Sequence, residues 1–247
     1  MRPLVSSQSS LIGPAEASPR KAAKAAGLAY LISFAIIAYV EFGVHQRFLG
    51  GDPILQPVDA AEAARNILAH EPLFRLGIAL LLSYCVGVAV VIAAFYTILA
   101  PFGRTIALVA AISRLLLAGT WILATAELFD TLRLLAGTRH LGEFTESQWQ
   151  ALASLPLSIR WDHYYAGLLF WGLSTALFSY LWLKSRHIPK AFAAFGVVSG
   201  AWAMLCAFAF IANPAFANTI NPWWFDTPLA IFEIVLSVVL LVKPIRT

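Results

Sequence analysis

The chain has 247 residues, of which 60% are hydrophobic and only 12% are charged. A soluble domain of this size would lack the polar residues to cover its surface, so the composition indicates a membrane protein. The formal net charge of +4 requires no nucleic-acid partner, because basic residues beside an anionic membrane surface account for it. No CxxC, HExxH, GxGxxG or Walker pattern is present, so the enzyme classes that those motifs define are not supported.

The first 20 residues are rich in Ser, Pro and small side chains and lack the continuous apolar core of a secretory signal peptide. We expect residues 1–20 to form a flexible cytoplasmic tail. A single membrane domain is expected over residues 21–247, because no later stretch has the length or charge of a second soluble domain.

Six apolar segments follow the tail, and each is about long enough to cross a hydrocarbon core as a helix. They cover roughly residues 24–48, 72–100, 105–136, 160–183, 189–212 and 224–243. Because hydrocarbon offers no partner to an unpaired backbone amide, we expect helices rather than strands. The fold class is therefore an all-α integral membrane protein, a bundle of six transmembrane helices.

A shorter helix is expected between the first two segments. Apolar residues recur there at helical spacing over residues 60–68, and Pro72 ends the run. This pattern predicts a short amphipathic helix on the outer surface of the membrane.

The basic residues are distributed unevenly between the two sides of this arrangement. One side carries all the lysines, and Glu16 is the one acid that accompanies them. The basic residues on that side are Arg2, Arg20, Lys21, Lys24, Arg104, Lys184, Arg186, Lys190, Lys243 and Arg246. The positive-inside rule therefore predicts that the N-terminus and the C-terminus are both cytoplasmic.

The fifth segment contains a GxxxG motif, GVVSG, formed by Gly196 and Gly200. Small residues at this spacing let two helices approach closely. We expect the motif to serve packing inside the chain; the alternative is a dimer through Gly196 and Gly200.

Two charged residues lie deep in the predicted spans. Arg114 and Glu233 are each about ten residues from the cytoplasmic end of their segment, which places both near the middle of the membrane. Charges at this depth are costly and usually face a partner, so we expect a buried ion pair. The same pair could alternatively serve a substrate or proton site.

A second set of polar residues gathers toward the outer ends of the segments. Its members are Glu41, His45, Arg75, Glu127, Asp130, Asp162 and His163. We expect them to line one outward-facing polar pocket for a lipid, a small ligand or a partner. Separate helix caps and surface ion pairs are the simpler alternative. Imidazole and carboxylate groups can also bind zinc or iron, and the candidate metal ligands are Glu41, His45, Asp130 and His163.

Several blocks of the sequence carry a resemblance to a known family. They are VDAAEAARNILAHEPLFRLGIA, SRLLLAG, YYAGLLFWGLSTALFSYLWLKSRHIPKAFAAFGVVSG and LAIFEIVLSVVLLVKP. The chain resembles, from about residue 24 onward, the domain of unknown function 4386 family of bacterial multi-pass membrane proteins. The matching positions are Asp59, Asn66, Arg75, Gly77, Arg114, Pro189, Gly196 and Glu233. The resemblance implies a six-helix protein of the bacterial inner membrane. It implies no catalytic residue, because the family has no established activity.

These patterns favour a non-enzymatic protein that binds a ligand or partner through the outer pocket, with no cofactor. A metal-dependent membrane hydrolase that uses the outer His and carboxylate groups is one alternative. A small-molecule transporter is another, although the cytoplasmic half of the segments is almost wholly apolar beyond Arg114 and Glu233.

Overall fold

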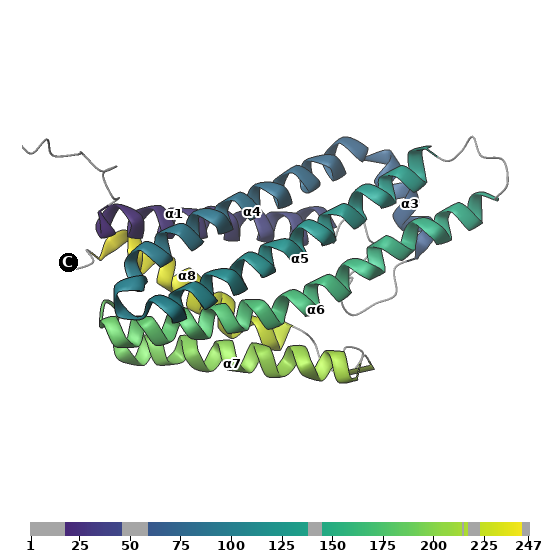
Figure 1. Cartoon of the computed structure of the whole chain (residues 1–247). Helices are drawn as coiled ribbons and strands as arrows, with labels where there is room; N and C mark the ends of the chain where they lie inside the picture. The colour runs from purple at the N-terminus through teal and green to yellow at the C-terminus, as the bar shows by residue number, and fades with distance from the viewer. Residues whose placement is uncertain (1–17, 46–58, 138–144, 214, 217–222, 244–247) are drawn as a thin grey trace, which may run out of the picture.

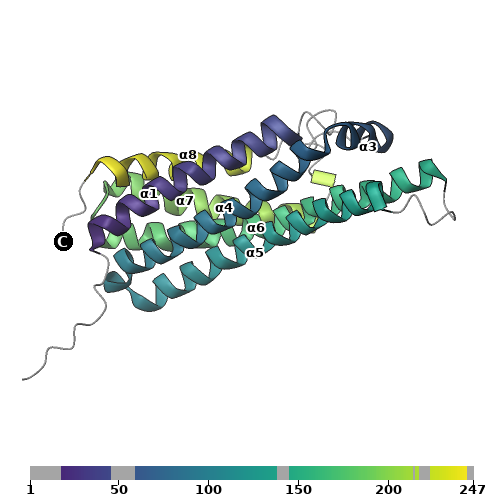
Figure 2. The same ribbon diagram turned by 90° about the horizontal axis from the view of Figure 1, so that it is seen from above.

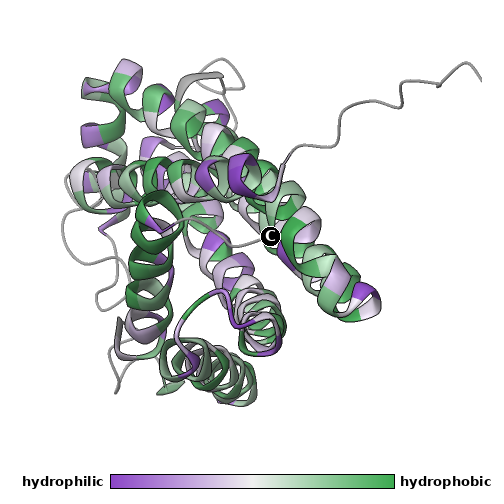
Figure 3. Ribbon diagram, turned by 90° about the vertical axis from the view of Figure 1, so that its left-hand side faces the viewer, coloured by the Kyte–Doolittle hydropathy of each residue, from purple (hydrophilic) through white to green (hydrophobic). Residues whose placement is uncertain are grey.

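The computed structural model describes residues 18–45, 59–137, 145–213, 215–216 and 223–243. The expected tail lies outside this part of the chain except for residues 18–20. Six helical segments are long and apolar enough to cross a membrane, which confirms the predicted all-α fold of six spans. In a view along the bundle, the ribbons of these helices are coloured mostly as hydrophobic (Figure 3).

The first two spans are joined by the predicted short helix. The first span consists of α1 (Pro19–Ala38), which continues as a π-helical turn, η1 (Tyr39–His45). Helix α3 (Ala60–Ala69) begins at Asp59, whose side chain accepts hydrogen bonds from the backbone amides of Ala61 and Glu62. The second span is α4 (Glu71–Leu99), and Pro72 lies in its first turn rather than closing α3.

The remaining spans follow with short connections. Helix α5 (Arg104–Gly137) comes after a single 3-10 turn, η2 (Ala100–Phe102). It is followed by α6 (Glu146–Ser185), α7 (Lys190–Ala212) and α8 (Trp223–Val242). The first residues of α1 and the last residues of α8 lie at the same end of the bundle, which we call the terminal end. Helix α3 lies at the opposite end, which we call the α3 end (Figures 1 and 2).

The six spans form a ring in chain order. Helix α1 packs against α4, α4 against α5, α5 against α6, α6 against α7, α7 against α8, and α8 closes the ring against α1. The closing contact lies near the terminal end, where a side chain on Gly27 of α1 would collide with the backbone of Ser237 in α8. Toward the α3 end, α8 instead packs Phe225 and Leu229 against α6 and α7. Helix α8 therefore crosses the bundle obliquely.

The helix that contains the fourth predicted span is longer than that span. The apolar segment was predicted at residues 160–183, whereas α6 begins at Glu146 and has 40 residues. At 1.5 Å per residue it is about 60 Å long, roughly twice the thickness of a hydrocarbon core. Its first turns are too polar to resemble a membrane segment, and they are helical because Thr145 and Gln148 form a capping box. Helices α5 and α6 thus run side by side past the other spans at the α3 end (Figures 1 and 2).

Helix α3 does not lie with its apolar face toward the membrane. That face, formed by Ala63, Ala64 and Ile67, is buried in a core that includes Leu132 of α5 and Leu157 of α6. The α3 end is therefore a packed protein layer built on the extension of α5 and α6.

The GxxxG motif lies inside the ring. A methyl group on Gly200 would come within 2.5 Å of the Gly172 carbonyl oxygen of α6, and one on Gly196 would collide with Ser179 and Phe232. Both glycines thus serve close contacts of α7 with α6 and α8. The face that the alternative dimer would require is covered within the chain.

Candidate functional site

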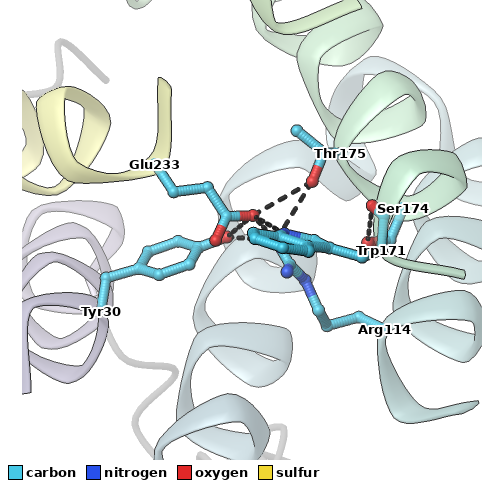
Figure 4. Close-up of polar contacts among 6 residues, drawn as sticks. All are labelled: Tyr30, Arg114, Trp171, Ser174, Thr175 and Glu233. Carbon is cyan, nitrogen blue, oxygen red and sulfur yellow. Dashed lines mark hydrogen bonds and ion pairs between the residues drawn. The ribbon is translucent and has the colours of Figure 1, made fainter. Parts of the chain in front are cut away.

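Five side chains from four helices meet at the centre of the bundle and form what we call the central network. They are Tyr30 of α1, Arg114 of α5, Trp171 and Thr175 of α6, and Glu233 of α8 (Figure 4). Arg114 and Glu233, which the sequence placed at the same depth, form an ion pair here. Tyr30 links the two charges, because it accepts a hydrogen bond from Arg114 and donates one to Glu233.

Glu233 is the acceptor on which the network converges. Its Oε1 atom accepts from Trp171 Nε1 at 2.7 Å, from Thr175 Oγ1 at 3.1 Å and from Tyr30 Oη at 3.3 Å. The same oxygen faces the Arg114 guanidinium. These bonds offset the cost of removing a carboxylate from water.

Arg114 is held by the same residues, and its side chain is only 3% exposed. Its guanidinium carbon lies 5.5 Å from the centre of the Tyr30 ring, a cation–π distance. Its Nε atom, however, is buried without a hydrogen-bond partner among the described residues. This nitrogen is enclosed by protein atoms, so it is an unsatisfied donor inside the bundle.

The central network forms the floor of a cavity of about 340 Å³. Helices α1, α4, α5, α6 and α8 supply its lining, and most of the lining residues between the network and the α3 end are apolar or aromatic, including Leu81, Val88, Leu117 and Trp121. This volume lies within the range of small-molecule sites, which combine apolar walls with a few polar groups.

From the exposure of its lining residues, we infer that the cavity opens between α1 and α8. The lining residues that are exposed at the surface are Phe34 and Phe42 of the first span and Thr227 and Ile231 of α8. The remaining described lining residues are buried or half-buried. Since α1 and α8 are in contact near the terminal end and separate toward the α3 end, the opening lies on the side of the bundle that faces lipid.

A second polar group, which we call the rim cluster, lines the cavity toward the α3 end. It consists of Glu41, Arg160, His163, Tyr164 and Asp226. Arg160 donates to Glu41 Oε2 at 3.0 Å, and Tyr164 donates to Asp226 Oδ2 at 2.6 Å. Both members of the Glu41–Arg160 pair are largely buried, with side-chain exposures of 13% and 6%.

The π-helical turn η1 contributes to this cluster. Glu41 lies within it, and a π-helix alters the rotation of the residues that follow relative to a regular α-helix. Such turns often occur at functional sites. In this chain the turn presents a carboxylate to α6, where Arg160 and Trp161 form a cation–π contact at 4.9 Å.

The structure brings only some of the predicted outer pocket residues together. Glu41 and His163 line the cavity, and Glu127 lies 3.4 Å from His163 Nε2 behind it. Arg75 and Asp130 instead form exposed pairs with Glu71 and Arg133 on their own helices. Asp162 is exposed and lies well inside α6. The side chain of His45 lies outside the described residues.

The candidate metal ligands whose side chains the structure describes do not meet at one site. Asp130 forms an exposed ion pair with Arg133, whereas Glu41 pairs with the buried Arg160. Among the described residues, no group of three or more His, Cys, Asp or Glu side chains has the arrangement of a metal site.

Several residues of the site are absent from the sequence-based set. Tyr30, Trp171 and Thr175 in the central network, and Tyr164 in the rim cluster, are polar residues inside apolar segments. Helical spacing offered a signal for two of them, because Trp171 and Thr175 are four residues apart and share a face of α6. That signal does not say which neighbour the face meets.

The fold and the cavity define a multi-pass α-helical membrane protein with a charged centre and a site within its ring of helices. The chain belongs to the family described as Domain of unknown function (DUF4386), whose family model matches residues 25–243. No curated protein and no solved structure matches the chain.

Proposed function

We propose that this protein binds an amphipathic molecule from the surrounding membrane in the cavity between α1 and α8. The observation that carries the proposal is the cavity itself, which has apolar walls, a charged floor and an opening on the lipid side. A molecule with a polar head and an apolar tail matches all three features.

The shape of the cavity supports binding rather than passage across the membrane. Its lining ends at Tyr30, Arg114 and Glu233, and the residues beyond them toward the terminal end form a close-packed core. That core includes Ala26, Phe95 and Trp182, all nearly inaccessible to solvent. A continuous polar path, which a transporter needs, is not formed by the described residues of this half.

The distribution of charge supports an orientation for this site. The terminal end carries exposed Lys24, Lys184 and Lys190, and an excess of lysine is typical of the cytoplasmic side. We place the terminal end in the cytoplasm of a bacterium and the α3 end outside its inner membrane. The cavity then opens toward the outer leaflet.

Lipid analysis of variants tests the proposed function. Ala230→Trp fills the cavity from α8, whereas Val235→Trp adds the same side chain to an exposed position of the same helix that does not line the cavity. We expect a membrane amphiphile to copurify with the wild type and with Val235→Trp, and mass spectrometry to show its loss from Ala230→Trp. Equal amounts of the same bound molecules in all three proteins would contradict the proposal.

A further inference from the structure

The hydrogen bonds of the central network leave one acceptor open on Glu233. All four contacts from Tyr30, Arg114, Trp171 and Thr175 end on Oε1 (Figure 4). Among the described residues, Oε2 of the same carboxylate receives none of these hydrogen bonds. An ionised carboxylate has about four acceptor positions, so Oε2 can accept a hydrogen bond from a molecule in the cavity.

The unpartnered Nε–H of Arg114 is not available to an occupant of the cavity. The nitrogen is enclosed by protein atoms, in a side chain that is only 3% exposed. The described hydrogen bonds of Arg114 run instead from one terminal nitrogen to Tyr30, Thr175 and Glu233. The group that the floor offers to an occupant is therefore the open acceptor, Glu233 Oε2.

Charge balance restricts the head group further. The central network contains one cation and one anion, already paired. An anionic head would add a second negative charge beside Glu233, and a cationic head would add a second positive charge beside Arg114. Either charge would be unpaired in an environment of low dielectric constant, which is unfavourable.

A hydroxyl group meets these conditions. It is uncharged and donates one hydrogen bond, so it can serve Glu233 Oε2 without adding a charge beside the ion pair. An ether or an isolated ketone can accept but cannot donate. The apolar walls and the opening between Phe34 and Ile231 then leave room for a long apolar tail directed into the lipid.

We propose that the occupant of the cavity is a long-chain membrane alcohol, with its hydroxyl group on the Arg114–Glu233 pair and its tail between α1 and α8. This assignment rests on the proposed function and specifies its ligand class. Acylglycerols and isoprenoid alcohols share this head chemistry, and both are membrane-soluble.

A series of probes with one tail and different heads tests the assignment. The full-length protein in phosphatidylcholine nanodiscs is titrated with oleyl alcohol, oleyl methyl ether, oleic acid and oleylamine, and thermal stabilisation is recorded. We expect oleyl alcohol to bind about tenfold or more tightly than the other three, because each lacks a matched donor or adds a charge. The affinities of monoolein and geranylgeraniol are then compared. The probe that binds more tightly identifies whether the hydroxyl group belongs to an acylglycerol or to an isoprenoid alcohol.

Two results separate failure of the assignment from failure of the proposed function. If oleic acid, oleylamine or the methyl ether binds as tightly as the alcohol, and Ala230→Trp abolishes that binding, the hydroxyl assignment is wrong while the cavity still binds amphiphiles. If no probe stabilises the wild type, or Ala230→Trp binds as the wild type does, the proposed function fails as well. Val235→Trp serves as the control and should bind as the wild type does.

Discussion

Arg114 is a charged residue in an environment very different from water. It is almost fully buried, ten residues after the start of α5, and is balanced by a single carboxylate, Glu233, with Tyr30 between them. Removing one charge leaves the other buried without its partner, whereas removing both leaves only neutral groups. The two losses should therefore not be additive.

We predict a strong coupling between Arg114 and Glu233 in a double-mutant cycle. Each of Arg114→Gln and Glu233→Gln should lower stability by about 3–5 kcal/mol, the usual range for breaking a buried ion pair. The double variant should lose clearly less than the sum of the two. Thermal unfolding of the four proteins in one detergent measures the coupling, and additive losses would show that the pair does not act as a unit.

The charged pair could be predicted from the sequence, but its surroundings could not. Arg114 and Glu233 are conspicuous because charges are rare in spans, and counting residues gives their depth. Tyr30 and Trp171 are not conspicuous, because aromatic residues in a span are usually packing residues or interfacial anchors. Their contact with Glu233 depends on the rotation of α1 and α6, which packing of the whole ring determines.

Helices α6 and α7 approach each other closely, and their glycines explain it. A methyl carbon added to Gly200 would lie 2.5 and 2.7 Å from backbone atoms of Gly172 and Ala176, so the neighbour cannot move aside unless the helices separate. In contrast, a methyl carbon added to Gly119 of α5 would have no atom within 4 Å. The two positions therefore form a matched pair of helical glycines.

We predict opposite effects for the same substitution at these two positions. Gly200→Ala should destabilise the protein by about 1–3 kcal/mol, because it overpacks a contact between backbones. Gly119→Ala should be neutral or stabilise the protein by up to about 1 kcal/mol, because alanine restricts the unfolded chain. The difference is read from thermal unfolding. A loss of stability at Gly119 equal to that at Gly200 would mean that helix contact is not the cause.

The extent of α6 shows where hydropathy stops being informative. Its C-terminal part is apolar and was predicted as a span, but the helix extends back to Glu146 through residues that water can solvate. Hydropathy identifies the part of a helix that lies in lipid, whereas capping and packing decide where the helix ends. Asp162 and His163 therefore lie well inside α6, although they are near the start of its apolar segment.

For the whole molecule, the ring of six spans brings both described ends of the chain to the terminal end, as an even number of crossings requires. The order of the helices around the ring was not predicted, because sequence gives no signal for which helices of a bundle are neighbours. The cavity follows from that order: α8 crosses obliquely and leaves α1 near the α3 end.

We predict that the terminal end faces the cytoplasm. Ser18→Cys and Ser147→Cys place single thiols on exposed residues at opposite ends of the bundle, in a background where Cys85 and Cys206 are replaced by alanine. A membrane-impermeant maleimide should label Ser147→Cys in intact cells and Ser18→Cys only after the inner membrane is opened. The reverse labelling pattern would invert the orientation and place the cavity toward the cytoplasmic leaflet.

The position of the ion pair also affects how the protein is made. Arg114 lies in the third span and Glu233 in the last, 119 residues later in the chain. At about 5–20 residues per second, a ribosome needs roughly 6–24 s to synthesise that interval. A lone arginine at the centre of an inserting helix costs about 2.5–3.5 kcal/mol. The nascent protein therefore carries an uncompensated arginine in its third span until α8 has been synthesised. The charge of Arg114 is neutralised only when Glu233 arrives, at the end of translation.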